Sequence, residues 1–132
     1  MNKREKGGRA EKRIQWYLRL RGWRIQYTNF YAAGGELDIV ASRGKTLAFV
    51  EVRSKSEKSA ELYGTPAESV TPRKQNSIIK AARQFIRTYR TFYPLYRFDV
   101  AEVTEKSNGK IKINYIENAF ICDMNNTHFN SH

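Results

Sequence analysis

The sequence has few of the residues on which several classes of catalytic site depend. It contains one cysteine, Cys122, which excludes an internal disulfide and a cysteine-ligated metal site. Its two histidines, His128 and His132, fall in an Asn-rich C-terminal stretch that we expect to be disordered. Histidine-dependent triads, histidine-ligated zinc and histidine general bases are therefore not expected. If the protein is an enzyme, carboxylates and a hard metal must carry the reaction.

Long apolar segments are also missing. No run of about 18 apolar residues is available for a membrane span, and the N-terminus, MNKREKGGR, lacks the apolar core of a signal peptide. We therefore expect a cytoplasmic protein with no membrane partner. The 132 residues are enough for one domain with a buried core. The expected parts are a flexible basic N-terminus over residues 1–8, a folded domain over 9–122 and a disordered tail over 123–132.

Acidic residues are scarce beside basic ones, 13 against 24, so the net charge is +11. Residues 1–24 hold nine Lys or Arg against two Glu, and residues 69–98 hold seven Lys or Arg and no acid. Such a field attracts polyanions, which favours a nucleic-acid partner. A solvated basic face or an anionic membrane is the alternative interpretation. The residues expected to contact nucleic acid are Arg9, Arg13, Arg73, Lys74, Gln75, Lys80, Arg83 and Arg87.

The spacing of apolar and turn residues predicts seven elements. They are a helix over 9–21, a strand over 23–30, two strands within 34–55 joined by a turn at 42–45, a helix that begins after the N-cap Thr71, and strands over 96–103 and 110–116. A loop over 54–70 separates the third strand from the second helix. The order α-β-β-β-α-β-β indicates an α/β or α+β sheet flanked by helices.

Charged residues interrupt the two central strands at regular intervals. Glu36 and Asp38 share one strand face, and so do Glu51, Arg53 and Lys55, with neighbours about 6.6–7 Å apart. Acids in so apolar a run cost desolvation energy unless something neutralises them. A hard cation such as Mg²⁺ or Mn²⁺ would do so, polarise a phosphate and activate a water. Ion pairs at a sheet edge, or a solvated face, are the alternative.

Two further features allow two interpretations each. Glu11, near the start of its helix, either interacts favourably with the helix dipole, or faces the strand acids and joins their site. Gly34 and Gly35 form a turn with positive φ, or they let a phosphate approach the backbone. Arg97 and Asp99, which share a strand face, are expected to pair with each other.

Taken together, the acids resemble the pattern of the PD-(D/E)XK nuclease superfamily, which has an acid on the first helix, an Asp in one strand and Glu-x-Lys on the next. Glu11, Asp38 and the run from Glu51 to Arg53 occupy these places in order. More closely, the sequence resembles the uncharacterised bacterial YraN family, related to archaeal Holliday junction resolvases. The matching segments are GRAE (8–11), GELDIV (35–40), FVEV (49–52), YGTPAESV (63–70), TPRKQ (71–75) and RFDV (97–100).

The resemblance implies a nuclease-like domain with the restriction endonuclease-like fold, a mixed central sheet flanked by helices. It implies a metal-dependent endonuclease that acts on DNA, with branched or junction DNA in repair or recombination as the suggested substrate, and it suggests a homodimer. Asp38 and Glu51, assisted by Glu36, would bind Mg²⁺ or Mn²⁺. The implied catalytic residues are Glu11, Asp38, Glu51, Arg53 and Lys55.

One departure from the family pattern affects the expected chemistry. The family usually reads Glu-Val-Lys-x-Arg, whereas this chain has Arg53 and Lys55 with the two bases exchanged. Arginine stays protonated, so it can bind phosphate but cannot give up a proton as lysine can. A non-catalytic nucleic-acid-binding protein with a degenerate site is therefore the alternative. A third hypothesis is an interaction protein whose basic surface meets an acidic partner or RNA.

Overall fold

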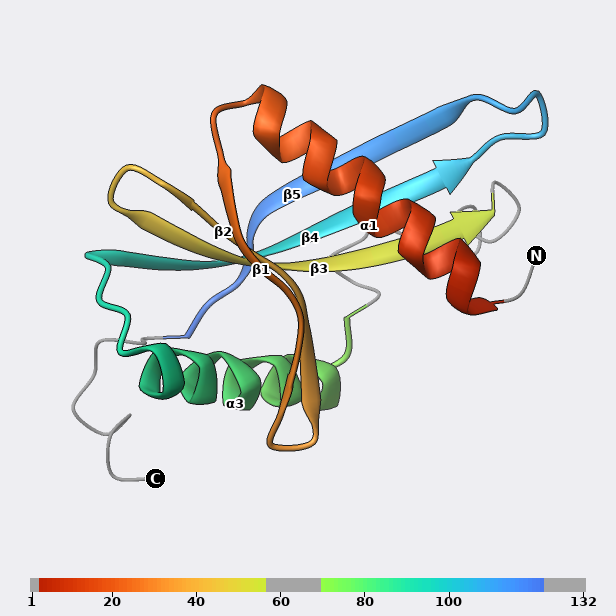
Figure 1. Ribbon diagram of the computed structural model, residues 1–132. Helices are drawn as coiled ribbons and strands as arrows, with labels where there is room; N and C mark the ends of the chain where they lie inside the picture. Colours follow the sequence, from red (N-terminus) through yellow and green to blue (C-terminus); the bar gives the residue numbers. More distant parts are fainter. Residues whose placement is uncertain (1–2, 57–69, 123–132) are drawn as a thin grey trace.

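The computed structural model describes residues 3–56 and 70–122 (Figure 1). The elements are α1 (Lys3–Leu20), β1 (Arg24–Ala32), β2 (Gly35–Arg43), β3 (Thr46–Ser56), α3 (Pro72–Tyr89), β4 (Leu95–Glu105) and β5 (Ile111–Phe120). The expected order of helices and strands is confirmed. The predicted tail and most of the predicted 54–70 loop lie outside the described residues, although β3 extends through its first residues to Ser56.

The five strands form one mixed sheet in the order β1-β2-β3-β4-β5. Strands β3 and β4 are parallel, and the other neighbouring pairs are antiparallel. Since parallel neighbours require a crossover, the connection between β3 and β4 contains α3. Figure 1 shows α1 lying across one face of the sheet and α3 along the other. Neither helix in the described part of the chain is long and apolar enough to cross a membrane.

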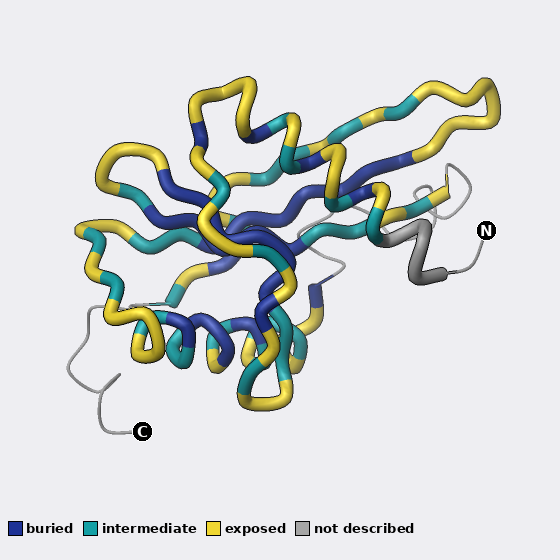
Figure 2. The backbone as a smooth tube through the Cα atoms, in the orientation of Figure 1, coloured by how far each residue is buried: buried dark blue, intermediate teal, exposed yellow. Residues whose placement is uncertain are grey.

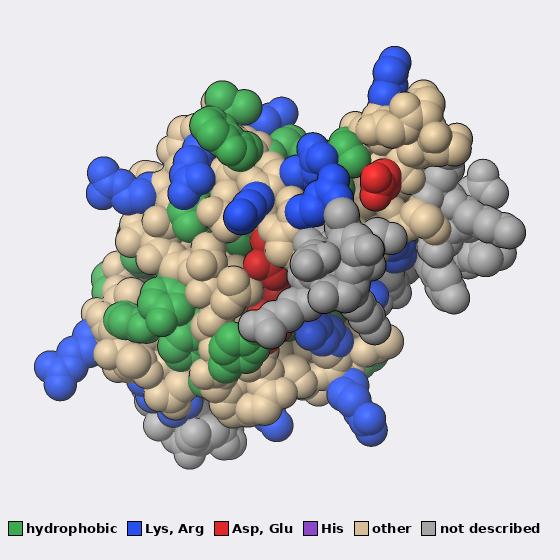
Figure 3. Space-filling model, turned by 45° about the vertical axis from the view of Figure 1, so that its right-hand side comes forward, with side chains coloured by type: hydrophobic (Ala, Val, Ile, Leu, Met, Phe, Trp, Pro, Cys, Tyr) green, Lys and Arg blue, Asp and Glu red, His purple; other side chains and the backbone are tan. Residues whose placement is uncertain are grey.

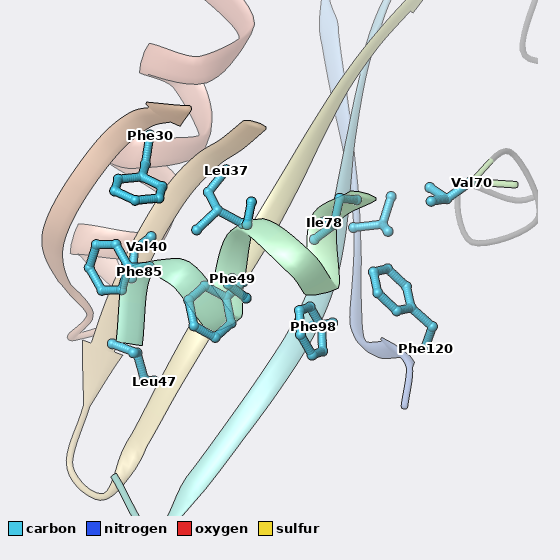
Figure 4. Packing of buried hydrophobic residues seen from close by; sticks show 13 residues of the cluster. Phe30, Leu37, Val40, Leu47, Phe49, Val70, Ile78, Phe85, Phe98 and Phe120 are labelled. Atoms are coloured by element: carbon cyan, nitrogen blue, oxygen red, sulfur yellow. The ribbon is translucent and has the colours of Figure 1, made fainter. Parts of the chain in front are cut away.

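Each helix buries an apolar stripe against its own face of the sheet. Under α3, Phe85 meets Phe49 edge to face, and Phe49 stacks on Phe98 (Figure 4). Under α1, Ile14 and Leu18 are fully buried in a second cluster that includes strand residues of the opposite parity. Figure 2 shows the central strands buried and the hairpin tips exposed. The sheet is therefore a rigid platform covered on both faces.

The helix boundaries follow from capping and propensity. Thr71 is the predicted N-cap of α3, and its hydroxyl accepts from the backbone N–H of Lys74 at 3.2 Å. Helix α1 ends before Gly22, which has a φ of +86°. Helix α1 begins at Lys3 and not at Arg9, where the sequence predicted its start. The Lys and Arg residues before the glycine pair are good helix formers, which favours this early start.

The glycine pair at the start of β2 has two different roles. Gly34, with a φ of +77°, makes the turn between β1 and β2, as expected. At Gly35 an added Cβ would lie 2.4 Å from the backbone oxygen of Ser77 in α3. Gly35 is therefore needed for close packing of strand and helix, a reason that sequence analysis did not find. This contact fixes the N-terminal half of α3 beside the start of β2.

Candidate metal and nucleic-acid site

Three acids from two elements converge at the start of β2. Glu11 comes from α1, and Glu36 and Asp38 come from one face of β2. One carboxylate oxygen from each lies within 4.8 Å of the other two. Glu11 therefore faces the strand acids, which is the second of its two interpretations. Figure 3 shows acidic side chains recessed near the centre of one face, with Lys and Arg nearby.

Asp38 is held where the β2–β3 ladder ends. The last paired residues at this end are Ile39 and Val50. Beyond them, Oδ2 of Asp38 accepts a hydrogen bond from the backbone N–H of Val52 at 2.8 Å. The side chain thus takes over the role of a backbone acceptor and is fixed in position. Asp38 is only 8% exposed.

Glu51 on β3 is the fourth acid of the site. It is 7% exposed, and its Oε1 lies 3.8 Å from Nζ of Lys74 in the first turn of α3. Glu51 does not belong to the close group formed by Glu11, Glu36 and Asp38, but its charge acts on Asp38. The structure thus brings together all four predicted acids, three of them closely.

Burial raises the pKa values of three of the four acids. Burial raises the pKa of Asp38 to about 8, and repulsion from Glu51 adds to the effect, while the bond from Val52 opposes it. Burial also raises the pKa of Glu51, against the opposing charges of Lys74 and Arg53. Burial raises the pKa of Glu11 too. Buried acids of this kind take up protons or a cation.

Asn29 is a site residue that sequence analysis missed. It lies on β1 between Thr28 and Phe30, which pair with Ile39 and Leu37 of β2. Its φ is +54°, in the left-handed region. With the amide nitrogen turned toward the acids, Asn29 donates to Glu36 Oε1 and Glu11 Oε2 at 3.1 Å each. Asparagine tolerates this backbone conformation better than most residues, but no sequence pattern marked it.

Asp99 on β4 is a buried acid of the opposite kind. Its two oxygens accept from Nε and Nη2 of Arg97 at 2.9 and 3.0 Å, as the predicted pair requires. The hydroxyl of Tyr115 and the backbone N–H of Asn118 also donate to it, at 2.5 and 2.9 Å. A carboxylate with four donors has its charge compensated within the protein. Asp99 is therefore a structural residue, and this contrast sets Asp38 and Glu51 apart.

The two bases that follow Glu51 on β3 differ in their surroundings. Arg53 is half-buried, and its charge acts on Glu51. Lys55 is placed in an ion pair with Glu102 of β4, with 3.1 Å between Nζ and Oε2. Both of these side chains are almost buried, at 10% and 5% exposed. The expected role of Lys55 at a phosphate thus competes with a buried ion pair.

The residues predicted to bind nucleic acid fall into three groups. Lys74 lies beside Glu51, as described above. Gln75 donates to the backbone oxygen of Val70 at 3.0 Å, and Arg83 is half-buried near Sγ of Cys122, at 3.9 Å. The side chains of Gln75 and Arg83 thus contact other residues of the protein. The exposed members are Arg9, Arg13, Arg73, Lys80 and Arg87.

Exposed basic residues are close to the acids in the sequence, but they do not all point toward them. Arg9 and Arg13 flank Glu11 on α1, while Arg73 precedes Lys74 on α3. Lys80 and Arg87 follow Lys74 along α3 by about 9 and 20 Å, from the helix rise. Residues two apart on a helix point to different sides, so Arg9 and Arg13 lie away from Glu11, beside Ser54, Val103 and Ile111.

Comparisons with known proteins agree on one family. The family model described as "Uncharacterised protein family UPF0102" matches residues 10–103, a segment that includes all four acids and Lys74. A UPF0102 protein of Caldicellulosiruptor saccharolyticus is 37% identical over 91% of this chain and 100% of its own length. One of Syntrophomonas wolfei is 38% identical over 89% of this chain and 98% of its own length.

Proposed function

The chain belongs to the uncharacterised protein family UPF0102. We propose that it is a metal-dependent endonuclease that cleaves DNA. The observation that carries this proposal is the gathering of four acids, in which buried Asp38 and Glu51 lie beside Glu11 and Glu36, with Lys74 3.8 Å from Glu51. A chain with a net charge of +11 gathers four carboxylates at one place and leaves them short of partners. A bound divalent cation is the simplest compensation.

The donor set fits a hard metal. Carboxylate oxygens suit Mg²⁺ and Mn²⁺, and the described part of the site contains no histidine or cysteine. Asp38 and Glu51 would hold the ion, with Glu36 and Glu11 as further oxygen donors. When bound, such an ion polarises a phosphodiester and lowers the pKa of its water. The charge of Arg53, which already acts on Glu51, would stabilise the charge that develops on the phosphate.

The arrangement of the site also supports a restriction endonuclease-like fold. Glu11 on the first helix, Asp38 on β2 and Glu51 on β3 follow the order of the PD-(D/E)XK pattern, and the sheet is mixed and flanked by helices. On this basis we propose branched or junction DNA as a substrate, and a homodimer to match the two-fold symmetry of a junction. The exposed basic residues would hold the backbone without selecting a sequence.

A second candidate function is nucleic-acid binding without cleavage. It is favoured by one observation, that Arg53 replaces the lysine of the family pattern while Lys55 is paired with Glu102. Such a protein would bind DNA equally well with and without Mg²⁺. Binding would also be insensitive to Asp38→Asn, which changes a carboxylate but no basic residue.

Cleavage of defined substrates tests the proposal. A labelled four-way junction, a linear duplex and a single strand are each incubated with Mg²⁺ or Mn²⁺. Wild type is compared with the Asp38→Asn/Glu51→Gln double variant, which removes both buried charges. Metal-dependent cutting that the double variant loses supports the endonuclease. Tight binding with no cutting in either metal favours the binding protein.

A further inference from the structure

We propose that Lys74, from the first turn of α3, is the lysine that acts on the attacked phosphate, in place of a lysine on β3. This inference rests on the proposed endonuclease and names a residue of the same site. Its starting point is the approach of Lys74 Nζ to within 3.8 Å of Glu51 Oε1. Strand β3 thereby supplies the acid, Glu51, and helix α3 supplies the base, Lys74, whereas the family pattern places both on one strand.

Neither base on β3 can supply the lysine. Arg53 offers a planar guanidinium fork beside Glu51, not the compact ammonium group on a flexible stem that a lysine supplies. Lys55 is held 3.1 Å from Glu102, where both side chains are almost buried. Breaking a buried pair of this kind leaves an uncompensated charge and is strongly unfavourable. Lys55 therefore stays with Glu102 when a phosphate binds.

Lys74 combines access with proximity. Its side chain is 39% exposed, whereas that of Glu51 is 7% exposed. A separation of 3.8 Å is longer than a hydrogen bond, so the ammonium group is attracted by Glu51 without being fixed to it. The flexible lysine stem lets Nζ turn to a phosphate oxygen or to a water beside the acids.

The backbone around Lys74 is firmly placed. The N–H of Lys74 donates to the N-cap hydroxyl of Thr71 at 3.2 Å. The close packing of Gly35 on Ser77 sets the distance between this part of α3 and the strand that carries Glu36 and Asp38. No acid lies in the first turn of the helix, so the positive end of the helix dipole adds to the charge of Lys74.

The first test is the rate of single-turnover cleavage with saturating Mn²⁺. Lys74→Met should lower the rate by about 10²–10³-fold, the usual loss for one group that stabilises transition-state charge. Lys74→Arg, which keeps the charge, should recover part of that loss. Lys112→Met, on the exposed side of β5, is the matched control and should cut at the wild-type rate. Equal cleavage by wild type and Lys74→Met would overturn the role of Lys74 and leave the endonuclease intact.

The second test does not depend on cleavage. Affinity for the labelled junction is measured in Ca²⁺ and in EDTA, so that the contribution of the bound cation is isolated. The wild type should bind more tightly in Ca²⁺, and Lys74→Met should bind at least about fivefold more weakly than wild type in Ca²⁺, the loss of one charged phosphate contact. If the wild type never cuts, the endonuclease fails, and this loss alone would still support Lys74 as a phosphate contact. Equal affinity of wild type and Lys74→Met for the junction in Ca²⁺ would overturn it.

Discussion

The backbone N–H of Val52 donates to Oδ2 of Asp38 at 2.8 Å, at the point where β2 and β3 stop pairing through their backbones. This one bond holds a buried carboxylate next to another, Glu51. Asp99 lies on β4, the strand next to that of Glu51. It is also buried, but it accepts hydrogen bonds from Arg97, Tyr115 and the backbone N–H of Asn118. Two buried aspartates in one sheet thus have opposite electrostatic surroundings, and they should respond to mutation in opposite ways.

The first prediction concerns the pH dependence of stability without metal. The pKa of Asp38 rises from 3.8 to about 8 on folding, so the folded chain binds this proton more tightly than the unfolded chain. The resulting stability is fully present below about pH 4 and is lost as the pH rises toward 8. Because each pKa unit corresponds to about 1.4 kcal/mol, wild type should lose at least about 2 kcal/mol relative to Asp38→Asn between pH 5 and pH 8. Urea denaturation in EDTA measures this difference.

Asp99→Asn should behave differently. Removing the charge leaves Arg97 half-buried without its carboxylate, and breaking a buried pair costs about 3–5 kcal/mol. The variant should therefore be destabilised at both pH 5 and pH 8 in the same urea experiment. If Asp99→Asn were neutral and Asp38→Asn destabilising at pH 8, the assignment of the two acids would be reversed.

A divalent cation should stabilise the wild type. Ligand at 100 times its dissociation constant adds about 2.7 kcal/mol to the free energy of unfolding. Mn²⁺ should therefore raise the Tm of wild type at pH 7 and leave that of the Asp38→Asn/Glu51→Gln variant nearly unchanged. Differential scanning fluorimetry across a Mn²⁺ titration measures both. Equal shifts in the two proteins would mean that the ion binds elsewhere.

Asn29 should affect metal binding and stability separately. Asn29→Ala loses the amide that lets asparagine occupy the left-handed region more readily than alanine, so it should be less stable by about 1 kcal/mol. Asn29→Gly also loses the amide but accepts that backbone conformation. Both variants should bind Mn²⁺ with altered affinity, because Glu11 and Glu36 lose a shared donor, while only Asn29→Ala should be clearly less stable. Equal stability of the two variants would argue against backbone strain at this position.

Gly35→Ala tests how α3 is positioned. Its new Cβ would lie 2.4 Å from the backbone oxygen of Ser77, and overpacking of this kind typically costs about 1–3 kcal/mol. Gly8→Ala is the matched control, since nothing lies within 4 Å of its added Cβ. Urea denaturation should show a loss for the first variant and none for the second. Because strand and helix must separate, Gly35→Ala should also slow any cleavage.

Much of the fold follows from local sequence. Alternating apolar residues, the Thr71 cap and the turn at Gly44 predict β2, β3 and α3 almost to their ends, because these signals act within a few residues. The predicted start of α1 at residue 9 was wrong, because Gly7 and Gly8 suggested that the helix begins after them. The propensity cost of glycine is about 1 kcal/mol each, too small to decide a boundary alone.

The site is less accessible to sequence analysis, because its contacts join distant segments. Glu36, Asp38 and Glu51 were found from their spacing on the strands, and Glu11 from the resemblance to the PD-(D/E)XK pattern. The partner of Lys55 depends on the β3–β4 register, which places it near Glu102, some 47 residues further along the chain. The roles of Asn29 and Gly35 depend on how β1 and α3 meet β2. None of these contacts leaves a local pattern.

The most direct test of the proposed site is the Mn²⁺ dependence of junction cleavage, measured beside Mn²⁺-induced stabilisation in the same buffer. If the acids bind the ion that supports cleavage, the dissociation constant derived from the stabilisation should equal the Mn²⁺ concentration at half-maximal cleavage, and Asp38→Asn should abolish both effects. Cleavage that persists in Asp38→Asn, or that saturates at a Mn²⁺ concentration unrelated to the stabilisation, would contradict a metal-dependent nuclease site at Asp38 and Glu51.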